Sequence, residues 1–489
     1  MNNSKACGED GVSLQLLKTV FPVVGPHLLH LINYSIVTGT VPVDWKFAVI
    51  VPLHKKGATD DPRNFRPISL LSNVAKLCEK IVTSQLSSYL VSNCILNDAQ
   101  HAYIPGHSTE TALATSLAFI TSRIDAGEVV SLASVDLSSA FDCVNHEILL
   151  QKLGWYGIDS TWFRDYLSNR QQRVRGGSCV QRVDAGVPQG SLTGPILFLL
   201  YTNDIPCHID CKTVSYADDA QFLVSSKASE LDQSITKLEL NLAHLESWYQ
   251  TNHLKLNSSK TQFVMFCTRQ MQRQLPTNIT LKIGDAVVTP ASSLKNLGVI
   301  MDRNLSWDEH VSETAQKCNK IIFPLAKHSH SLSEHVLGKL METLVIPHLS
   351  YCAPVWGGLC ANQRQRLQKV INRAARVVTK TPRSAHITPV LTRLGWRSIK
   401  DIVKRKDATL VHHAIHSPCA PVSLKSLFKL RTAVSERRTR AKRSALELPP
   451  IRTELARHSL PYRAAALWNS LPEQVTDVDH KSFKALLPF

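Results

Sequence analysis

Two adjacent acids, Asp218 and Asp219, interrupt an apolar stretch that runs from Val214 to Val224. β-Branched and aromatic residues on both sides of the acids predict two strands joined by a tight turn. Two carboxylates held ~4 Å apart repel each other by roughly 4 kcal/mol at an effective dielectric near 20, and a bound divalent cation offsets that repulsion. The alternative is an ordinary solvated hairpin turn, because Asp is common in turns.

A third acid, Asp136, follows a strand predicted over residues 129–135, and helical spacing begins at Ala140. A carboxylate at a strand end and an acidic pair at a hairpin tip can meet at one pair of metal ions, which phosphoryl transfer uses ~3.5–4 Å apart. Between them in sequence, the Gly/Pro loop 186–192 opens an apolar helix predicted over 195–201. Amides exposed at a helix start suit contact with phosphate or a base pair.

These three segments, in this order, resemble blocks of reverse transcriptases, of the type found in non-LTR (LINE-like) retrotransposons. Asp136 with Phe141-Asp142 matches the first block, Gly186–Ser191 the second and Tyr216–Asp219 the third. The resemblance runs from about residue 5 to beyond residue 300 and includes four more blocks, Pro52–Gly57, Asn64–Ser69, Leu256–Thr261 and Leu294–Val299. Upstream, Gly8–Gly11 echoes a Gly-Pro-Asp-Gly sequence of such elements, with Glu9 in place of Pro.

The resemblance implies a ligand set for two Mg²⁺ ions, with Mn²⁺ as a substitute: Asp136, Asp218 and Asp219, of which Asp219 is the least firmly implied. Lys260 matches a lysine that acts as general acid for the departing pyrophosphate, and a surface lysine is the alternative reading. Phe141 falls where a bulky side chain excludes a ribose 2′-hydroxyl, and core packing is its alternative.

The resemblance also implies a nucleotide-binding surface. Gln189 is expected to lie against the nascent base pair, and Gly190 to let the backbone approach the nucleotide. Arg66 matches an arginine that contacts the triphosphate, where a guanidinium fits the oxygens in bidentate fashion. Lys55 is a weaker candidate, because a solvated turn explains it equally well. Asp142 follows Phe141 but stays outside the ligand set.

The charge of the chain is concentrated in one segment. The whole chain carries +17, and residues 351–450 hold 21 Lys and Arg against 4 Asp and Glu, which equals that excess. Such a localised excess predicts a polyanion-binding surface. Six cations recur at helical spacing beside an apolar stripe and are the predicted nucleic-acid contacts: Arg364, Arg366, Lys369, Arg373, Arg376 and Lys380. The run Arg437–Arg443 fits either nuclear import or further backbone contacts.

Composition places the protein inside the cell, in the nucleus, the cytoplasm or both. No uninterrupted apolar run reaches the ~18 residues of a membrane span, and the start shows no signal peptide, so no membrane is expected. Twelve scattered cysteines fit a reducing compartment. Cys207, His208 and Cys211 lack a nearby fourth ligand, which argues against zinc.

The predicted fold is α+β: a right-hand polymerase with fingers, a palm built on an antiparallel sheet and a helical thumb, followed by a mostly helical basic region. An extended break is predicted over 351–357, before the basic helix. The expected divisions are an N-terminal extension (1–34), fingers and palm (35–302), thumb (303–350), basic region (351–450) and tail (451–489).

The predicted function is RNA-directed DNA polymerisation, with an RNA template, a DNA primer and dNTPs as partners. The alternative is a catalytically inactive or co-opted remnant that binds RNA or DNA. An RNA-dependent RNA polymerase shares the acidic pair but not Phe141 at the sugar position. The matched blocks begin almost at residue 1, so no endonuclease domain is expected ahead of them, and no RNase H domain is evident after them. We therefore expect a fragment or truncated copy of an element's polyprotein. Oligomeric state is left open.

Overall fold

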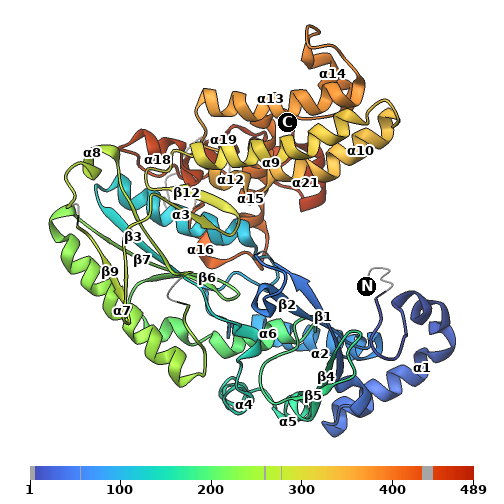
Figure 1. Cartoon of the computed structure of the whole chain (residues 1–489). Coiled ribbons are helices and arrows are strands. Elements are labelled where there is room, and N and C mark those ends of the chain that lie inside the picture. The colour runs from blue at the N-terminus through green and yellow to red at the C-terminus, as the bar shows by residue number, and fades with distance from the viewer. Residues whose placement is uncertain (1–5, 56, 258–259, 277, 432–443) are drawn as a thin grey trace.

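The computed structural model describes residues 6–55, 57–257, 260–276, 278–431 and 444–489. The chain is a mixed α+β protein, as predicted, and its central element is a four-stranded antiparallel sheet in the order β6-β7-β3-β8 (Figure 1). The four strands are β3 (Val129–Val135), β6 (Lys212–Tyr216), β7 (Asp219–Ser226) and β8 (Gln262–Phe266). Helices α3 (Thr109–Asp125) and α7 (Leu231–Thr251) pack against this sheet.

The middle strand β3 is buried on both faces. Val129, Ala133 and Val135 belong to the core that includes the apolar stripe of α7, whereas Val130 and Leu132 belong to the core that includes α3. Because successive side chains of a strand point to opposite faces, a strand between two helical layers needs apolar residues at nearly every position. This explains why the segment lacks the polar alternation of a half-exposed strand.

A second sheet has the strand order β2-β1-β4-β5, with β1 antiparallel to β2 and parallel to β4. The backbone N–H of Ser69 on β2 donates to the Gln189 carbonyl at 2.7 Å, which joins this sheet to the loop 186–192. The strands are β1 (Phe47–His54), β2 (Phe65–Leu70), β4 (Arg170–Val174) and β5 (Val180–Val183). The helices of this half are α1 (Leu14–Thr38), α2 (Asn73–Ser92), α4 (His146–Trp155), α5 (Thr161–Leu167) and α6 (Gly194–Thr202).

Helix α1 is long and apolar enough to span a membrane when judged by length and composition alone, which no other helix of the described ranges achieves. Its sequence also contains Pro22 and Pro26, and its buried residues include Leu14 and Ile32, on a helix that contacts α2 and α5. Buried core helices and signal sequences meet the same criteria. The expectation that no membrane is involved therefore stays a prediction.

The helices after residue 303 share a core with the central sheet. One hydrophobic cluster contains Leu113 on α3, Val299 on β12, Ile322 on α9, Ile371 on α13 and Val403 on α15. The predicted boundary at residue 350 runs through this cluster, so the segments on either side of it pack together. The elements are β9 (Leu281–Ile283), β10 (Ala286–Val288), β11 (Ser293–Asn296), β12 (Val299–Asp302), α9 (Asp308–Lys327), α10 (Glu334–Leu344), α11 (Ile346–Ser350), α13 (Ala361–Thr379), α14 (Ile387–Leu394) and α15 (Ile399–His416).

The C-terminal tail folds back onto this body (Figure 1, red). Arg463 donates to both carboxylate oxygens of Asp407 at 2.8 and 2.9 Å and to the Pro354 carbonyl at 2.7 Å. Asp125, at the end of α3, accepts backbone N–H groups of Arg452 and Thr453. These contacts hold the tail against α3 and α15. Its helices are α18 (Glu454–His458), α19 (Leu460–Ser470), α20 (Glu473–Thr476) and α21 (His480–Leu486).

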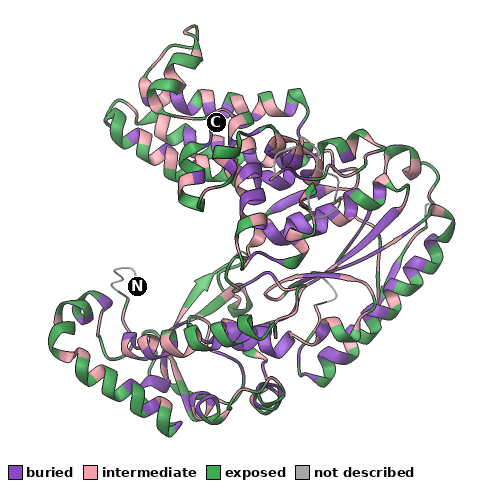
Figure 2. Cartoon of the chain, turned by 180° about the vertical axis from the view of Figure 1, so that it is seen from behind, coloured by how far each residue is buried: buried purple, intermediate pink, exposed green. Residues whose placement is uncertain are grey.

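Two local predictions differ from the structure. The helical spacing from Ala140 is divided into a 3₁₀ turn, Ala140–Asp142, and helix α4, which begins only at His146 behind an Asn145 cap. The predicted extended break at 351–357 contains a short helix, α12 (Ala353–Trp356), whose four residues are all buried and which contacts α3 and α15. Burial between two helices overrides the turn-like composition there (Figure 2, purple). Arg437–Arg443 lies outside the described residues.

Candidate active site

Three carboxylates meet at one end of the central sheet. Asp136 follows the last residue of β3, and Asp218 and Asp219 lie at the tip of the β6–β7 hairpin, which confirms the predicted strand–turn–strand. The ladder pairs Val135 with Ala220. The next step of this antiparallel register places Asp136 opposite Asp219.

The acids lie close enough to disturb each other's protonation. Burial, followed by the charges of Asp218 and Asp136, raises the pKa of Asp219 to about 6. Burial is also the main cause that raises the pKa of Asp218, and the charge of Asp136 adds to it. Like charges and desolvation both disfavour the ionised forms. A cation placed among the three acids would favour the ionised forms and so oppose both effects.

Two basic side chains supply positive charge at this site. Lys260 Nζ lies 2.9 Å from Asp136 Oδ2, so the predicted general acid and the predicted metal ligand form an ion pair. Arg66, on β2, acts on both acids of the hairpin, because its charge lowers the pKa of Asp218 and of Asp219. The structure therefore brings these two basic residues and the three acids together.

The chemistry of these side chains fits a hard divalent ion. Within the described ranges, no group of three His, Cys, Asp or Glu side chains already has the geometry to hold a metal. The carboxylates of Asp136, Asp218 and Asp219 are nevertheless the oxygen donors that Mg²⁺ prefers, and their mutual repulsion is the kind that a bound cation relieves. The residues thus fit the predicted ligand set by donor type and charge.

The loop 186–192 lies beside the residues that follow β3. Gln189 Nε2 donates to both carboxylate oxygens of Asp142, at 2.8 and 2.9 Å. Burial raises the pKa of Asp142, while its bond to Gln189 and the charge of Lys55 oppose that shift. Gly190 has a φ of 126°, and a Cβ there would lie 2.6 Å from the Ser69 carbonyl oxygen. Only glycine fits this close approach of two backbones.

Phe141 stacks on Phe198 of α6, with ring centroids 4.4 Å apart and an angle of 20° between the planes. Phe198 is fully buried, whereas Phe141 is half-buried. One face of Phe141 therefore packs on the core, and the residue lies in the 3₁₀ turn that follows Asp136 in the chain. Its role in sugar selection stays a prediction.

The comparison with known protein families accounts for this arrangement. Residues 53–301 match the family described as reverse transcriptase (RNA-dependent DNA polymerase), about half of the chain. The matched range contains all three acids and every residue predicted to bind the nucleotide. The chain belongs to the reverse transcriptase family.

Within that family, the chain is similar to curated proteins encoded by mobile elements. It is 28% identical over 438 residues to a probable RNA-directed DNA polymerase from transposon BS of Drosophila melanogaster, covering 84% of this chain and 47% of the relative. It is 24% identical over 396 residues to the RNA-directed DNA polymerase from mobile element jockey of the same species, covering 77% and 42%. The chain thus spans less than half the length of these relatives. The predicted resemblance to non-LTR retrotransposon enzymes is confirmed.

The reverse transcriptase region contains a buried acid that the sequence analysis missed. Glu79 on α2 is 2% exposed. It accepts hydrogen bonds from the Tyr166 hydroxyl and from the backbone N–H of Leu192, both at 2.7 Å. Burial raises the pKa of Glu79. The carboxyl therefore anchors the end of the loop that carries Gln189, and its only sequence signal is an acid on the apolar stripe of α2.

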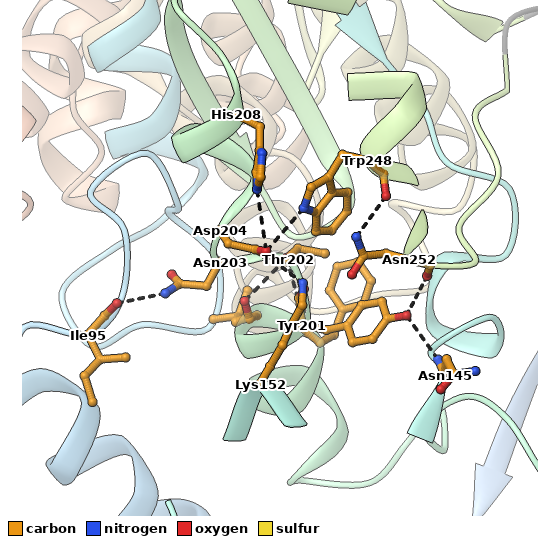
Figure 3. Close-up of polar contacts among 12 residues, drawn as sticks. Ile95, Asn145, Lys152, Tyr201, Thr202, Asn203, Asp204, His208, Trp248 and Asn252 are labelled. Atoms are coloured by element: carbon orange, nitrogen blue, oxygen red, sulfur yellow. Dashed lines mark hydrogen bonds and ion pairs between the residues drawn. The ribbon is translucent and has the colours of Figure 1, made fainter. Parts of the chain in front are cut away.

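A buried lysine holds helix α6 in place beside the site (Figure 3). Lys152 on α4 is 2% exposed and donates to the Tyr201 carbonyl at 2.7 Å and to Asp204 at 2.8 Å. Its ammonium also lies 4.5 Å from the centroid of the Trp248 ring. Burial lowers the pKa of Lys152, and Asp204 opposes that shift. These contacts fix α6, which carries Phe198, against α4 and α7.

The predicted basic helix is α13, which contains five of the six predicted cations; Lys380 follows it as the C-cap, in a left-handed conformation. At 3.6 residues per turn, four of the five lie within a sector of about 80° on the side away from the apolar stripe: Arg366, Lys369, Arg373 and Arg376. Arg364 points elsewhere and donates to the Leu359 carbonyl. Arg366 and Arg373 reach Ser312 and Asn319 of α9, so part of the face is already hydrogen-bonded. We call the four residues of this sector together with Lys380 the basic face; its exposed members are Lys369, Arg373 and Lys380.

Proposed function

We propose that this chain is an RNA-directed DNA polymerase of a non-LTR retrotransposon, which extends a DNA primer on an RNA template with dNTPs. The observation that carries this proposal is the meeting of Asp136, Asp218 and Asp219 at one end of the antiparallel sheet. Asp136 is separated by more than eighty residues from the other two, and the fold alone brings them together. Family membership and the named relatives support the same activity.

The three acids are the proposed ligands of two Mg²⁺ ions, for which Mn²⁺ is a substitute. Such ions, when bound, activate the primer 3′-hydroxyl and stabilise the charge of in-line transfer. Lys260, held 2.9 Å from Asp136, would give a proton to the leaving pyrophosphate. Arg66 offers a guanidinium to the triphosphate oxygens.

The remaining site residues select and position the nucleotide. Phe141, supported from behind by Phe198, would exclude a ribose 2′-hydroxyl by occupying its space. Gln189 and Gly190 would contact the nascent base pair, with Gln189 oriented by Asp142 and Gly190 by its close approach to β2. Lys55 adds positive charge beside Asp142.

We further infer a right-hand arrangement of these parts. The sheet β2-β1-β4-β5 and α2 would form fingers, the central sheet the palm, and α9 to α11 the thumb. The basic face of α13 would then contact the phosphate backbone of the template or primer.

All twelve cysteines, each within the described residues, are free thiols, which supports a reducing intracellular location.

The test is primer extension by the full chain on a primed RNA template with Mg²⁺, comparing dNTPs with rNTPs. Asp218→Asn keeps the side-chain shape and removes one ligand charge, so extension should fall at least a hundredfold, or about 2.7 kcal/mol at ~1.4 kcal/mol per decade. Template binding, measured by fluorescence anisotropy, should stay within about twofold, because phosphate contacts supply most of that affinity.

Asp210→Asn is the matched control, because Asp210 is 94% exposed and pairs with Lys237 at the surface. This variant should extend primers like the wild type. Extension by Asp218→Asn above about a tenth of wild type would contradict the ligand assignment. A folded wild type that binds RNA but incorporates neither dNTPs nor rNTPs would instead favour the alternative, an inactive nucleic-acid-binding remnant.

A further inference from the structure

The loop that precedes α3 runs along the outer edge of strand β6. The Ser215 N–H donates to the Ala99 carbonyl at 2.7 Å, and the His101 N–H donates to the Ser215 carbonyl at 2.8 Å. Gln100 and Ser215 thereby form a parallel bridge just before the acidic hairpin tip. A polar side chain at Gln100 is therefore held within reach of the turn that carries Asp218.

The side-chain amide of Gln100 binds the backbone of that turn. Its Oε1 accepts the N–H of Ala217 at 3.0 Å, and its Nε2 donates to the Ala217 carbonyl at 3.4 Å. The same Oε1 accepts N–H groups from His101 at 3.0 Å and Ala102 at 2.9 Å, so it is itself held in place. Both backbone polar groups of Ala217 are thus paired with one side chain.

Ala217 needs such support because of its backbone conformation. Tyr216 pairs with Asp219, so Ala217 and Asp218 form a two-residue hairpin loop. Ala217 has a φ of 56°, whereas Asp218 is not among the residues with positive φ. A turn with positive φ only at its first central position favours glycine there, and an alanine in that position is strained. The strain lies one residue before the first acid of the pair.

The loop that carries Gln100 is also held by contacts with α3 and α15. His101 Nδ1 lies 2.9 Å from the Thr111 hydroxyl of α3, and His413 of α15 makes a 2.7 Å bond to the Gly106 carbonyl. A Cβ on Gly106 would lie 2.3 Å from the Cys419 carbonyl oxygen, so this loop packs tightly on the C-terminal body. The amide of Gln100 is therefore presented from a fixed base.

We propose that Gln100 is a positioning residue for the acidic pair: its amide holds Ala217 in the strained conformation that directs Asp218 and Asp219 toward Asp136. The expected effect on catalysis rests on the proposed function. The expected effect on the hairpin conformation does not, because it follows from the hydrogen bonds to Ala217 alone. The glutamine acts through Ala217 and touches no reacting atom.

The first test measures the turn directly, by hydrogen–deuterium exchange of peptides that span residues 214–220. Gln100→Met keeps the side-chain length and removes both hydrogen-bonding groups, so these amides should exchange at least about tenfold faster. The matched control is Asn203→Leu. Asn203 donates to the Ile95 carbonyl at 2.8 Å (Figure 3). It also accepts the Asn97 N–H at 2.8 Å, so it holds the start of the same loop. The control should leave exchange at 214–220 unchanged.

The second test is steady-state primer extension by the same variants. Gln100→Met should lower kcat roughly 10- to 100-fold while KM for dNTP and Kd for template–primer stay within about twofold, because the nucleotide contacts are elsewhere. Adding Ala217→Gly should restore most of the lost kcat, since glycine adopts positive φ without strain. If Gln100→Met does not fold, Gln100→Leu, which also removes both hydrogen-bonding groups, serves in both assays.

Three results would overturn the proposal: unchanged exchange at 214–220 in a folded Gln100 variant, an equal kcat loss in Asn203→Leu, or no recovery with Ala217→Gly. A wild type without extension activity would contradict the proposed function instead. In that case the exchange experiment alone still decides whether Gln100 holds the turn.

Discussion

Replacing Arg463 by methionine tests whether the C-terminal tail is an integral part of the reverse transcriptase fold. Arg463 on α19 forms an ion pair with Asp407 on α15. This ion pair is deeply buried, with the side chain of Asp407 1% exposed and that of Arg463 18% exposed. Arg463→Met keeps the aliphatic length but leaves the Asp407 carboxylate buried without its partner. It also removes donors from the Pro354 and His458 carbonyls. Breaking a buried ion pair from one side costs about 3–5 kcal/mol, which is the expected loss in the free energy of unfolding.

The assay is urea unfolding of the full chain, followed by tryptophan fluorescence, with the free energy taken from midpoint and slope. The double variant Arg463→Met/Asp407→Leu should recover most of the loss, because an apolar pair of similar volume carries no unpaired charge. Arg457→Met is the control: its ion pair with Glu454 has side chains 61% and 71% exposed and should contribute at most about 1 kcal/mol. A loss below about 1 kcal/mol for Arg463→Met, or no recovery in the double variant, would refute the reasoning.

Three further predictions concern sugar selection, nucleic-acid binding and pH. Phe141→Ala should raise rNTP use relative to dNTP use in single-nucleotide incorporation; unchanged selectivity in an active variant would make Phe141 only a core residue. Changing the three exposed cations of the basic face to Gln should reduce the slope of log Kd against log salt by about 2, at ~0.7–0.9 per phosphate contact. Arg364→Gln, off that face, should leave the slope unchanged, and equal slopes for both variants would contradict the assignment. Burial lowers the pKa of His310 to about 4. The unfolded chain takes up this proton near pH 6.5, so stability should fall by about 2 kcal/mol between pH 7 and pH 5, and His310→Gln should remove that part of the urea-midpoint shift.

Deleting everything after residue 350 would remove the segment that holds the charge excess, which begins at residue 351, but it would not test the basic face alone. The structure shows that Val299 before this point and Ile371 after it lie in one hydrophobic cluster. Cutting between them would expose that core, and the loss of binding would then report unfolding. Point substitutions on the surface of α13 avoid this problem.

Local pattern was enough to predict the centre of the site. Strand ends and hairpin tips can be predicted from neighbouring residues in the sequence. The positions of Asp136, directly after an apolar strand, and of Asp218 and Asp219, between two apolar strands, could therefore be predicted. The helical period likewise placed four of the six basic residues on one face of α13; it failed for Arg364, which points elsewhere, and for Lys380, which follows the end of the helix. The resemblance to a known family added the partners of these residues.

Tertiary structure alone decided which other residues support the site and which hold the C-terminal tail. Gln100 bonds to a backbone 117 positions away, Glu79 to one 113 positions away, and Asp407 to a side chain 56 positions away. Such pairings leave no period or spacing in the sequence, because each depends on two surfaces that meet only when the sheets and helices have packed. The residues proposed to carry the chemistry could therefore be predicted from the sequence of strand ends and turns. The residues that hold those turns in place could be identified only from long-range packing.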